Sequence, residues 1–354
     1  MRVLTGGAPL SSEDQGGWKH VGVSVKRWSF APLADLRLIL QTMREVLVEK
    51  PDSLHLVTLK PIVVAGMAAI VARALSGRDM SIVATVPGLG RLMSPGSTMR
   101  GRSANVARYL VGRAVSFMSR RRNVKFTFET VADYNMWVGK GLVPAQAAQV
   151  IGGAGVDPAV FYPGSSTREG GPLRVLFASR LLKSKGLDVF VRAAQMLRGS
   201  EGVEFIVAGM VEPDDPDAVS IVDLAKEPAI HFLGKRNDMG DLLRQVDVVC
   251  LPTRYGEGIP RILIEASATG IPSIVSEHEG CREIVEDGRT GVVVYDTVGE
   301  RAAKGVAKAI ASYRDDRDLL RRHGTAAREK FVHGDFAEQG VVKQFTDLLA
   351  SNAR

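Results

Sequence analysis

Short apolar segments alternate with longer amphipathic segments along most of the 354-residue chain. Apolar runs bounded by Gly, Pro and polar clusters are typical of strands, and apolar positions three or four apart are typical of helices. The alternation predicts an α/β protein with parallel sheets. In the first half, we expect strands at 20–25, 54–59, 81–86 and 124–128, and helices at 33–49, 63–75, 104–121 and 132–139. In the second half, we expect strands at 173–178, 204–208, 230–233, 246–251, 272–275 and 291–294, and helices at 187–197, 239–244, 260–267, 279–285, 301–314, 316–330 and 336–349.

A Gly- and Pro-rich stretch at 151–166 interrupts this pattern and is typical of a linker. A chain of this length is also too long for one ordinary core. We therefore expect a first domain over 1–164 and a second over 165–335, with a C-terminal helical segment over 336–354 that crosses back to the first domain.

Composition places the chain among soluble globular proteins, with 45% apolar and 24% charged residues. Cys250 and Cys281 belong to no CxxC motif or Cys/His cluster, so we expect no metal site and no disulfide, and a reducing compartment fits. No run of about 18 apolar residues and no signal peptide are apparent, so a cytoplasmic setting is expected.

Charge is distributed unevenly between the two halves. Residues 1–165 carry a net charge of +10, and the remainder carries −3. The segment from Arg91 to Lys125 holds nine basic residues and no acidic one. Such a segment attracts phosphate groups of anionic lipid or nucleic acid, and the alternative is a solvated basic helix face. Because its only interleaved aromatic residues are Tyr109 and Phe117, nucleic acid is not expected as a partner.

Two cations follow the predicted strand 173–178. Arg180 and Lys185 stand five positions apart, and a helix is expected to open at Gly186. Point charges beside the backbone donors of a helix N-terminus suit a pyrophosphate, although an exposed turn can carry the same residues.

The segment after the predicted strand 246–251 is more specific. A Gly-Glu-Gly turn containing Glu257 and Gly258 leads through Ile259 and Pro260 into a helix that carries Glu265. Glu257 on the loop and Glu265 about one and a half turns into the helix can face one cleft. A carboxylate among apolar neighbours requires a partner, which ribose hydroxyls would supply, and the amides from Gly258 to Pro260 can meet an anionic group.

These motifs, with Pro272 and the segment 280–291, resemble the retaining GT-B glycosyltransferases of family 4 over nearly all of 150–345. The resemblance implies two Rossmann-like domains facing a cleft. It also implies that Arg180 and Lys185 bind the donor diphosphate and that Glu265 binds the donor ribose. Glu257 would lie by the transferred sugar, and Gly258, Ile259, Pro260 and Gly234 would complete the donor site. No metal and no cofactor are implied, because the two cations and the helix dipole neutralise the leaving diphosphate.

The first half resembles the N-terminal domains of capsule and O-antigen transferases at 59–61 and 85–90. These enzymes act on lipid-diphosphate-linked glycans, so the basic run Arg91–Lys125 would hold the chain against an anionic membrane, peripherally at the cytoplasmic face. The acceptor-side candidates are His55, Lys60, Gly88 and Glu129. His55 is expected at the end of a strand near the cleft, although a lone histidine is more often structural.

Two features depart from the family pattern. Only residues 2–5 and a polar stretch precede the expected strand 20–25, so the first βα unit is expected to be missing. Pro87 also stands where a threonine-like residue is expected.

The resemblance implies a metal-independent, retaining hexosyltransferase. It would transfer a hexose or N-acetylhexosamine-type sugar from a nucleoside-diphosphate sugar to a lipid-linked glycan in cell-surface polysaccharide synthesis. Two alternatives remain: an inactive homologue that binds nucleotide sugars, and a nucleotide-sugar epimerase on the same fold. A Rossmann dehydrogenase is disfavoured, because no strand leads into a GxGxxG motif followed by an acidic residue.

Overall fold

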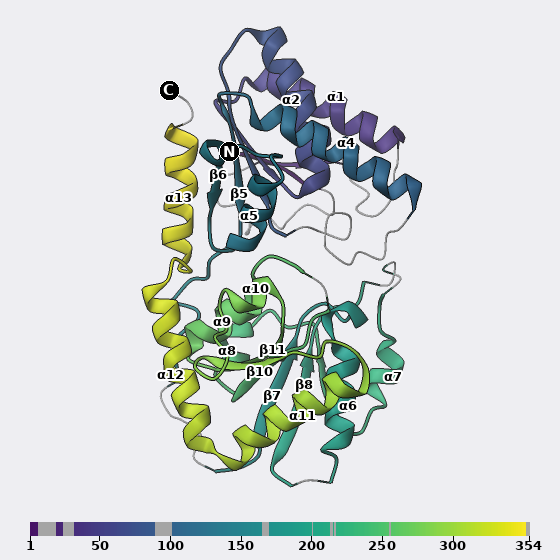
Figure 1. Ribbon diagram of the computed structural model, residues 1–354, viewed down its shortest axis with the longest axis vertical. Helices are drawn as coiled ribbons and strands as arrows, with labels where there is room; N and C mark the ends of the chain where they lie inside the picture. The colour runs from purple at the N-terminus through teal and green to yellow at the C-terminus, as the bar shows by residue number, and fades with distance from the viewer. Residues whose placement is uncertain are drawn as a thin grey trace.

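The computed structural model describes residues 1–5, 19–23, 32–88, 101–164, 170–199, 201–212, 215, 217–254 and 256–351. Two parallel sheets, each with its own apolar core, lie one above the other in Figure 1. The chain passes from the first sheet to the second near residue 160 and returns to the first at its C-terminus.

The first sheet has four strands in the order β3-β4-β5-β6. Its strands are β3 (Ser53–Val57), β4 (Ser81–Val86), β5 (Val124–Phe128) and β6 (Ala148–Val150). Its helices are α1 (Pro32–Glu49), α2 (Leu59–Ser76), α4 (Arg102–Ser119) and α5 (Val131–Gly139), with a short 3-10 turn at Ala145–Ala147. Ile82, Phe126, Phe128 and Trp137 are fully buried between this sheet and its helices.

Two short strands at the N-terminus form a separate parallel pair. They are β1 (Arg2–Thr5) and β2 (Lys19–Gly22), and residues 6–18 between them lie outside the described residues. Arg2 fastens the pair to α1 through ion pairs of 2.8 Å with Glu45 and 2.8 Å with Glu49. The predicted strand 20–25 is therefore shorter than expected and lies outside the four-stranded sheet.

The second sheet has six strands in the order β12-β11-β10-β7-β8-β9. Its strands are β7 (Leu173–Ala178), β8 (Val203–Ala208), β9 (His231–Gly234), β10 (Val248–Leu251), β11 (Ser273–Ser276) and β12 (Gly291–Val294). Its helices are η3 (Lys183–Lys185), α6 (Leu187–Met196), α7 (Ile221–Ala225), α8 (Met239–Leu243), α9 (Arg261–Thr269), α10 (Glu279–Arg282), α11 (Gly299–Asp315) and α12 (Arg317–His333).

The last helix, α13 (Glu338–Ser351), runs beside the first sheet. Val341 and Leu348 of this helix pack against Val83 of β4 and Ile151. The boundaries proposed at 164 and 335 stay predictions, although the packing of α13 is of the kind that a returning helix requires.

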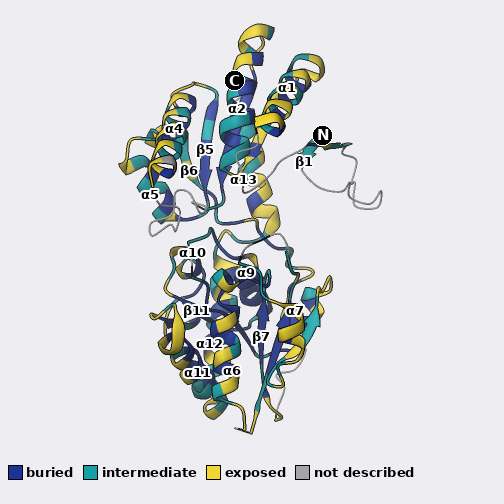
Figure 2. Cartoon of the chain, turned by 90° about the vertical axis from the view of Figure 1, so that its right-hand side faces the viewer, coloured by how far each residue is buried: buried dark blue, intermediate teal, exposed yellow. Residues whose placement is uncertain are grey.

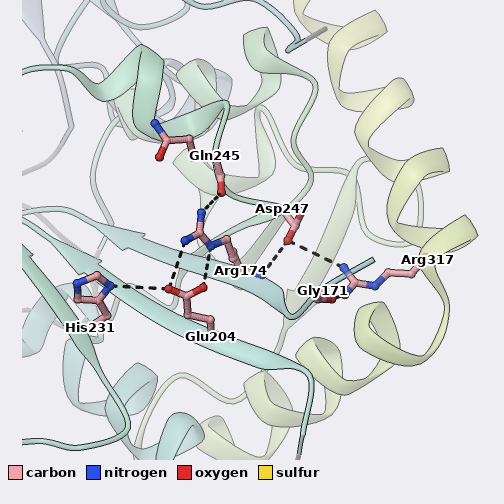
Figure 3. Close-up of polar contacts among 7 residues, drawn as sticks. All are labelled: Gly171, Arg174, Glu204, His231, Gln245, Asp247 and Arg317. Carbon is pink, nitrogen blue, oxygen red and sulfur yellow. Dashed lines mark hydrogen bonds and ion pairs between the residues drawn. The ribbon is translucent and has the colours of Figure 1, made fainter. Parts of the chain in front are cut away.

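A polar network closes the amino ends of the central strands of the second sheet (Figure 3). Arg174 of β7 donates to Glu204 of β8 at 2.7 Å, and the backbone N–H of Arg174 donates to Asp247 at 2.7 Å. His231 of β9 lies 3.7 Å from Glu204. In a parallel sheet, all strands begin at one edge and end at the opposite edge. This network at the amino ends is therefore remote from the loops at the carboxyl ends that carry Lys185 and Glu257.

Several predicted boundaries are wrong by a few residues. The helix expected from residue 63 begins at Leu59, so Lys60 and Pro61 lie in its first turn, where a missing proline N–H is tolerated. The helix expected over 279–285 ends at Arg282. The short elements β6 and α7 were not predicted.

Candidate active site

The candidate residues of the second sheet lie where its strand order reverses. The chain adds β8 and β9 on one side of β7, and then β10, β11 and β12 on the other. In open α/β sheets, ligands bind outside the carboxyl ends of the strands at such a reversal. Lys185 follows β7 and Glu257 follows β10, so the two loops that flank this position carry both residues.

Lys185 and Glu257 form an ion pair between these loops. The Lys185 side chain is buried, with the residue 6% exposed, so its charge requires the carboxylate as compensation. The backbone also ties the loops together, because the N–H of Arg254 donates to the carbonyl of Ser184 at 2.7 Å. Gly186 has a φ of 79°, and a Cβ there would lie 1.9 Å from the carbonyl oxygen of Pro252. The sequence thus needs glycine at this close approach.

Arg180 has a different carboxylate partner. Its guanidinium donates to Glu212 at 3.0 Å, on the loop after β8. The loop after β8 also contacts the turn that carries Lys185, because the N–H of Ser184 donates to Asp217 at 2.7 Å. A phosphate that binds both cations must therefore compete with Glu212 and Glu257.

Glu265 is buried in α9, with 8% of the residue exposed. Arg261, one turn earlier, donates to it at 2.9 Å. Burial raises the pKa of Glu265, and the charge of Arg261 opposes that rise. The predicted buried carboxylate is present, but its partner within the protein is Arg261. Among the contacts of the described residues, none joins Glu265 to Arg180 or Lys185.

Glu129, at the end of β5, reaches the loop of the second domain. Its carboxylate accepts the N–H of Ile259 at 3.0 Å, and the carbonyl of Pro87 accepts the N–H of Gly258 at 3.1 Å. Burial is the main cause that raises the pKa of Glu129 to about 7, the Ile259 hydrogen bond lowers it, and Glu257 and Asp133 raise it further.

These contacts correct one expectation. The amides from Gly258 to Pro260 were expected to be free for an anionic group, but Gly258 and Ile259 donate to the first domain. Pro260 has no N–H to offer. In this arrangement the first domain occupies the loop amides that the sequence assigned to a ligand.

Three glycines allow the backbones to meet here. A Cβ on Gly88 would lie 2.6 Å from the backbone nitrogen of Gly258. A Cβ on Gly280 would lie 2.0 Å from the carbonyl oxygen of Gly258. A Cβ on Gly258 itself would lie 1.9 Å from the carboxylate of Glu129. Gly88 therefore serves the junction between the domains, with a φ of 118° that favours glycine.

Additional acidic residues lie around the junction between the two domains. Glu283 accepts the N–H of Val131 at 2.9 Å, which ties α5 to the second domain. Burial, together with Glu279 and Glu283, raises the pKa of Asp133 to about 6, although Thr130 lowers it through a hydrogen bond. The junction thus collects carboxylates from both domains.

His55 does not lie where the sequence placed it. It sits in the middle of β3, hydrogen-bonded to Thr85 at 2.7 Å, and its ring lies 4.9 Å from that of Phe345 on α13. Thr85 continues the chain to Thr127 at 2.7 Å. Burial lowers the pKa of His55. The expected position at the end of a strand is therefore wrong, and the side chain lies on the sheet face that α13 covers.

Two further candidate residues, Lys60 and Gly234, make contacts with nearby elements of their own domain. Lys60 forms an ion pair of 2.7 Å with Asp35 of α1. Gly234 ends β9 with a φ of 68°, and its carbonyl accepts the N–H of Gly209 at 2.9 Å. Gly234 thus remains at the carboxyl edge of the sheet, whereas Lys60 joins two helices of the first domain.

Sequence reasoning missed His278 and Cys281 as neighbours of Glu257. Burial lowers the pKa of His278, and Glu257 raises it. Burial raises the pKa of the Cys281 thiol, with an added contribution from Glu257 and an opposing one from Lys185. Both residues follow β11, the strand next to β10, and that adjacency is the signal that could have placed them here.

The loops after β7 and β10 lie within a segment that is similar to known proteins. Residues 172–315 match the family model described as "Glycosyl transferases group 1". Over these residues the chain is similar to the group 1 glycosyl transferases. The matched segment runs from β7 into α11 and contains Arg180, Lys185, Glu257 and Glu265.

Curated relatives match the chain in part. The colanic acid biosynthesis glycosyltransferase WcaL of Salmonella typhimurium is 32% identical over 229 residues, which are 61% of this chain and 54% of WcaL. The N,N'-diacetylbacillosaminyl-diphospho-undecaprenol alpha-1,3-N-acetylgalactosaminyltransferase of Campylobacter jejuni is 34% identical over 118 residues, which are 33% of this chain and 30% of that enzyme. The chain thus matches about half of WcaL and a smaller part of the second enzyme.

Solved structures match nearly the whole chain. Anabaena HepE in complex with UDP gives a TM-score of 0.71 at 20% identity, covering 94% of this chain and 86% of HepE. Sucrose-phosphate synthase from Thermosynechococcus elongatus gives 0.73 at 17% identity, covering 94% and 82%. These likenesses confirm the predicted α/β fold with parallel sheets, similar to GT-B glycosyltransferases.

Proposed function

We propose that the chain is a metal-independent, retaining glycosyltransferase. It moves a hexose or N-acetylhexosamine-type sugar from a nucleoside-diphosphate sugar to a lipid-linked glycan. The observation that carries the proposal is the ion pair between the buried Lys185 and the partly buried Glu257 where the strand order reverses, within the segment that matches the family. The names of the relatives, which include an enzyme acting on a diphospho-undecaprenol-linked sugar, support the acceptor class.

In the proposed reaction, the bond between the anomeric carbon and the diphosphate oxygen breaks. The acceptor hydroxyl forms a new bond to that carbon on the same face, and its proton leaves with the diphosphate. Arg180 and Lys185 stabilise the negative charge that develops on the leaving group. Glu265 binds the donor ribose, and Glu257 lies by the transferred sugar.

Donor binding requires a change in the present contacts. Because Glu212 and Glu257 hold the two cations, the diphosphate must displace both carboxylates. Because Gly258 and Ile259 donate to Pro87 and Glu129, their amides become available only when the first domain moves away. The occupied amides also favour a second candidate, a non-catalytic protein that binds nucleotide sugars.

A transfer assay separates the candidates. With an undecaprenyl-diphosphate-linked sugar as acceptor and UDP-, GDP- and ADP-sugars as donors, Arg180→Ala and Lys185→Ala should each abolish turnover. Lys183→Ala, in the same loop but exposed, is the matched control and should keep it. Full turnover in Lys185→Ala would contradict the assignment. Donor binding by wild type without turnover would favour the second candidate, and a changed sugar without any acceptor would indicate an epimerase.

We also propose that the enzyme works peripherally at the cytoplasmic face of the membrane. Support comes from the basic run Arg91–Lys125, of which 91–100 lies outside the described residues. Helix α4 falls within this run and contains no acidic residue. By length and composition, α2 could cross a bilayer, but one such helix is weak evidence, and α2 packs on α1, α4 and the first sheet.

A further inference from the structure

Helix α1 exposes a row of leucines on one side. Leu33 is 78% exposed, Leu36 51% and Leu40 58%. Residues three and four positions apart lie on the same face of a helix. The opposite face, with Ala34, Leu38 and Val46, is buried, so α1 is apolar on both sides. A contiguous exposed apolar surface, unlike scattered single residues, marks an interaction site.

The charges of this face are positive. Arg37 and Arg44 are exposed on the same helix, interleaved with the leucines. Of the acidic residues of α1, Asp35 pairs with Lys60 at 2.7 Å and Glu49 pairs with Arg2 at 2.8 Å, whereas Glu45 pairs with Arg2 at 2.8 Å and also with the exposed Arg44 at 3.6 Å.

The neighbouring helices have the same character. Helix α2 contacts both α1 and α4, as the three labelled helices in Figure 2 illustrate. Helix α4 exposes Val106, Tyr109 and Leu110 and carries no Asp or Glu. Exposed apolar side chains beside basic ones are typical of helices that lie in a membrane interface.

We propose that the outer face of α1 docks on an anionic phospholipid bilayer. Leu33, Leu36 and Leu40 enter the interfacial region, and Arg37 and Arg44 lie at the level of the lipid phosphates. Charge complementarity favours an anionic bilayer over an apolar protein groove as the binding partner, because the arginines on this face attract anions. The inference deepens the membrane location in the proposed function, but the docking itself does not depend on catalysis.

Vesicle co-sedimentation of the full chain tests the proposal. Wild type should bind vesicles of phosphatidylcholine with phosphatidylglycerol, and bind phosphatidylcholine vesicles much more weakly. The variant L33S/L36S/L40S should lower the partition coefficient about tenfold or more, since three leucines lose their burial. R37Q/R44Q should lower binding to the anionic vesicles alone, and added salt should mimic it.

The control is V332S, which changes an equally exposed apolar side chain on α12 of the second domain and should leave partitioning unchanged. Melting temperatures close to that of wild type would show that the variants fold. Unchanged vesicle binding by the leucine variant would overturn the proposal. Failure of wild type to bind vesicles of either composition would overturn it as well. A dimer that the leucine variant converts to monomer, with vesicle binding intact, would assign the face to a second copy instead.

Titration of the same variants with nucleotide sugars keeps the two proposals apart. Vesicle binding without donor binding would count against the transferase alone. Donor binding without vesicle binding would count against the docking face alone.

Discussion

The protonation of the Glu129 carboxyl group should make the free energy of unfolding depend on pH. Burial raises its pKa from 4.5 to about 7, so the folded protein holds this proton more tightly than the unfolded chain does. The stability contributed by this group is therefore fully present below pH 4.5 and is lost as the pH rises through about 7. The shift corresponds to on the order of 3 kcal/mol.

Glu129→Gln removes the titration and keeps an oxygen that can accept the N–H of Ile259. At roughly 2 °C per kcal/mol, the variant should melt on the order of 5 °C above wild type at about pH 8. At pH 4.5 the two should differ by less than about 1 °C. Asp133, whose pKa is raised to about 6, titrates in both proteins, and its charge is one of the causes that raise the pKa of Glu129 in wild type.

Differential scanning calorimetry across this pH range provides the measurement. Melting curves of variant and wild type that stay parallel from acid to alkaline pH would refute the reasoning. That result would mean that Glu129 titrates alike in the folded and unfolded chain.

Two further substitutions test the junction and the core. Gly258→Ala should push the domains apart and raise the radius of gyration in small-angle X-ray scattering, because the new Cβ would lie 1.9 Å from Glu129 and 2.7 Å from the carbonyl of Pro87. Gly256→Ala, with no atom within 4 Å, should leave the radius unchanged, and an equal effect of both would contradict this account. Tyr313→Phe removes a buried hydrogen bond of 2.8 Å to His323 and should lower the free energy of unfolding by about 1–2 kcal/mol in urea titrations, whereas an unchanged midpoint would show that the bond contributes little.

Local patterns were sufficient for most elements around the second sheet, although they missed α7. The strand Leu173–Ala178 was predicted to the residue, because an apolar run there ends at polar loop residues. The loops with Lys185 and Glu257 could be expected at one edge, since carboxyl ends of parallel strands share an edge. The pairing of these residues could not be predicted, because it depends on β7 and β10 being neighbours although 72 positions separate the two side chains.

The errors have related causes. His55 was placed by its distance from a strand end, but its contacts depend on which face of β3 it occupies and on α13, almost 300 residues later. The contact of Glu129 with Ile259 depends on how two domains meet, which no periodicity records. The roles of the site residues remain proposals.

The central claim is that Lys185 and its loop bind the diphosphate of a nucleotide sugar. Isothermal titration of UDP-, GDP- and ADP-sugars into wild type, Lys185→Ala and Lys183→Ala tests it most directly. We predict that one donor binds wild type and Lys183→Ala alike, and that Lys185→Ala binds it about a hundredfold more weakly, the loss of roughly 3 kcal/mol expected for a charged contact. Equal affinity of Lys185→Ala and wild type, with both variants folded, would contradict the account.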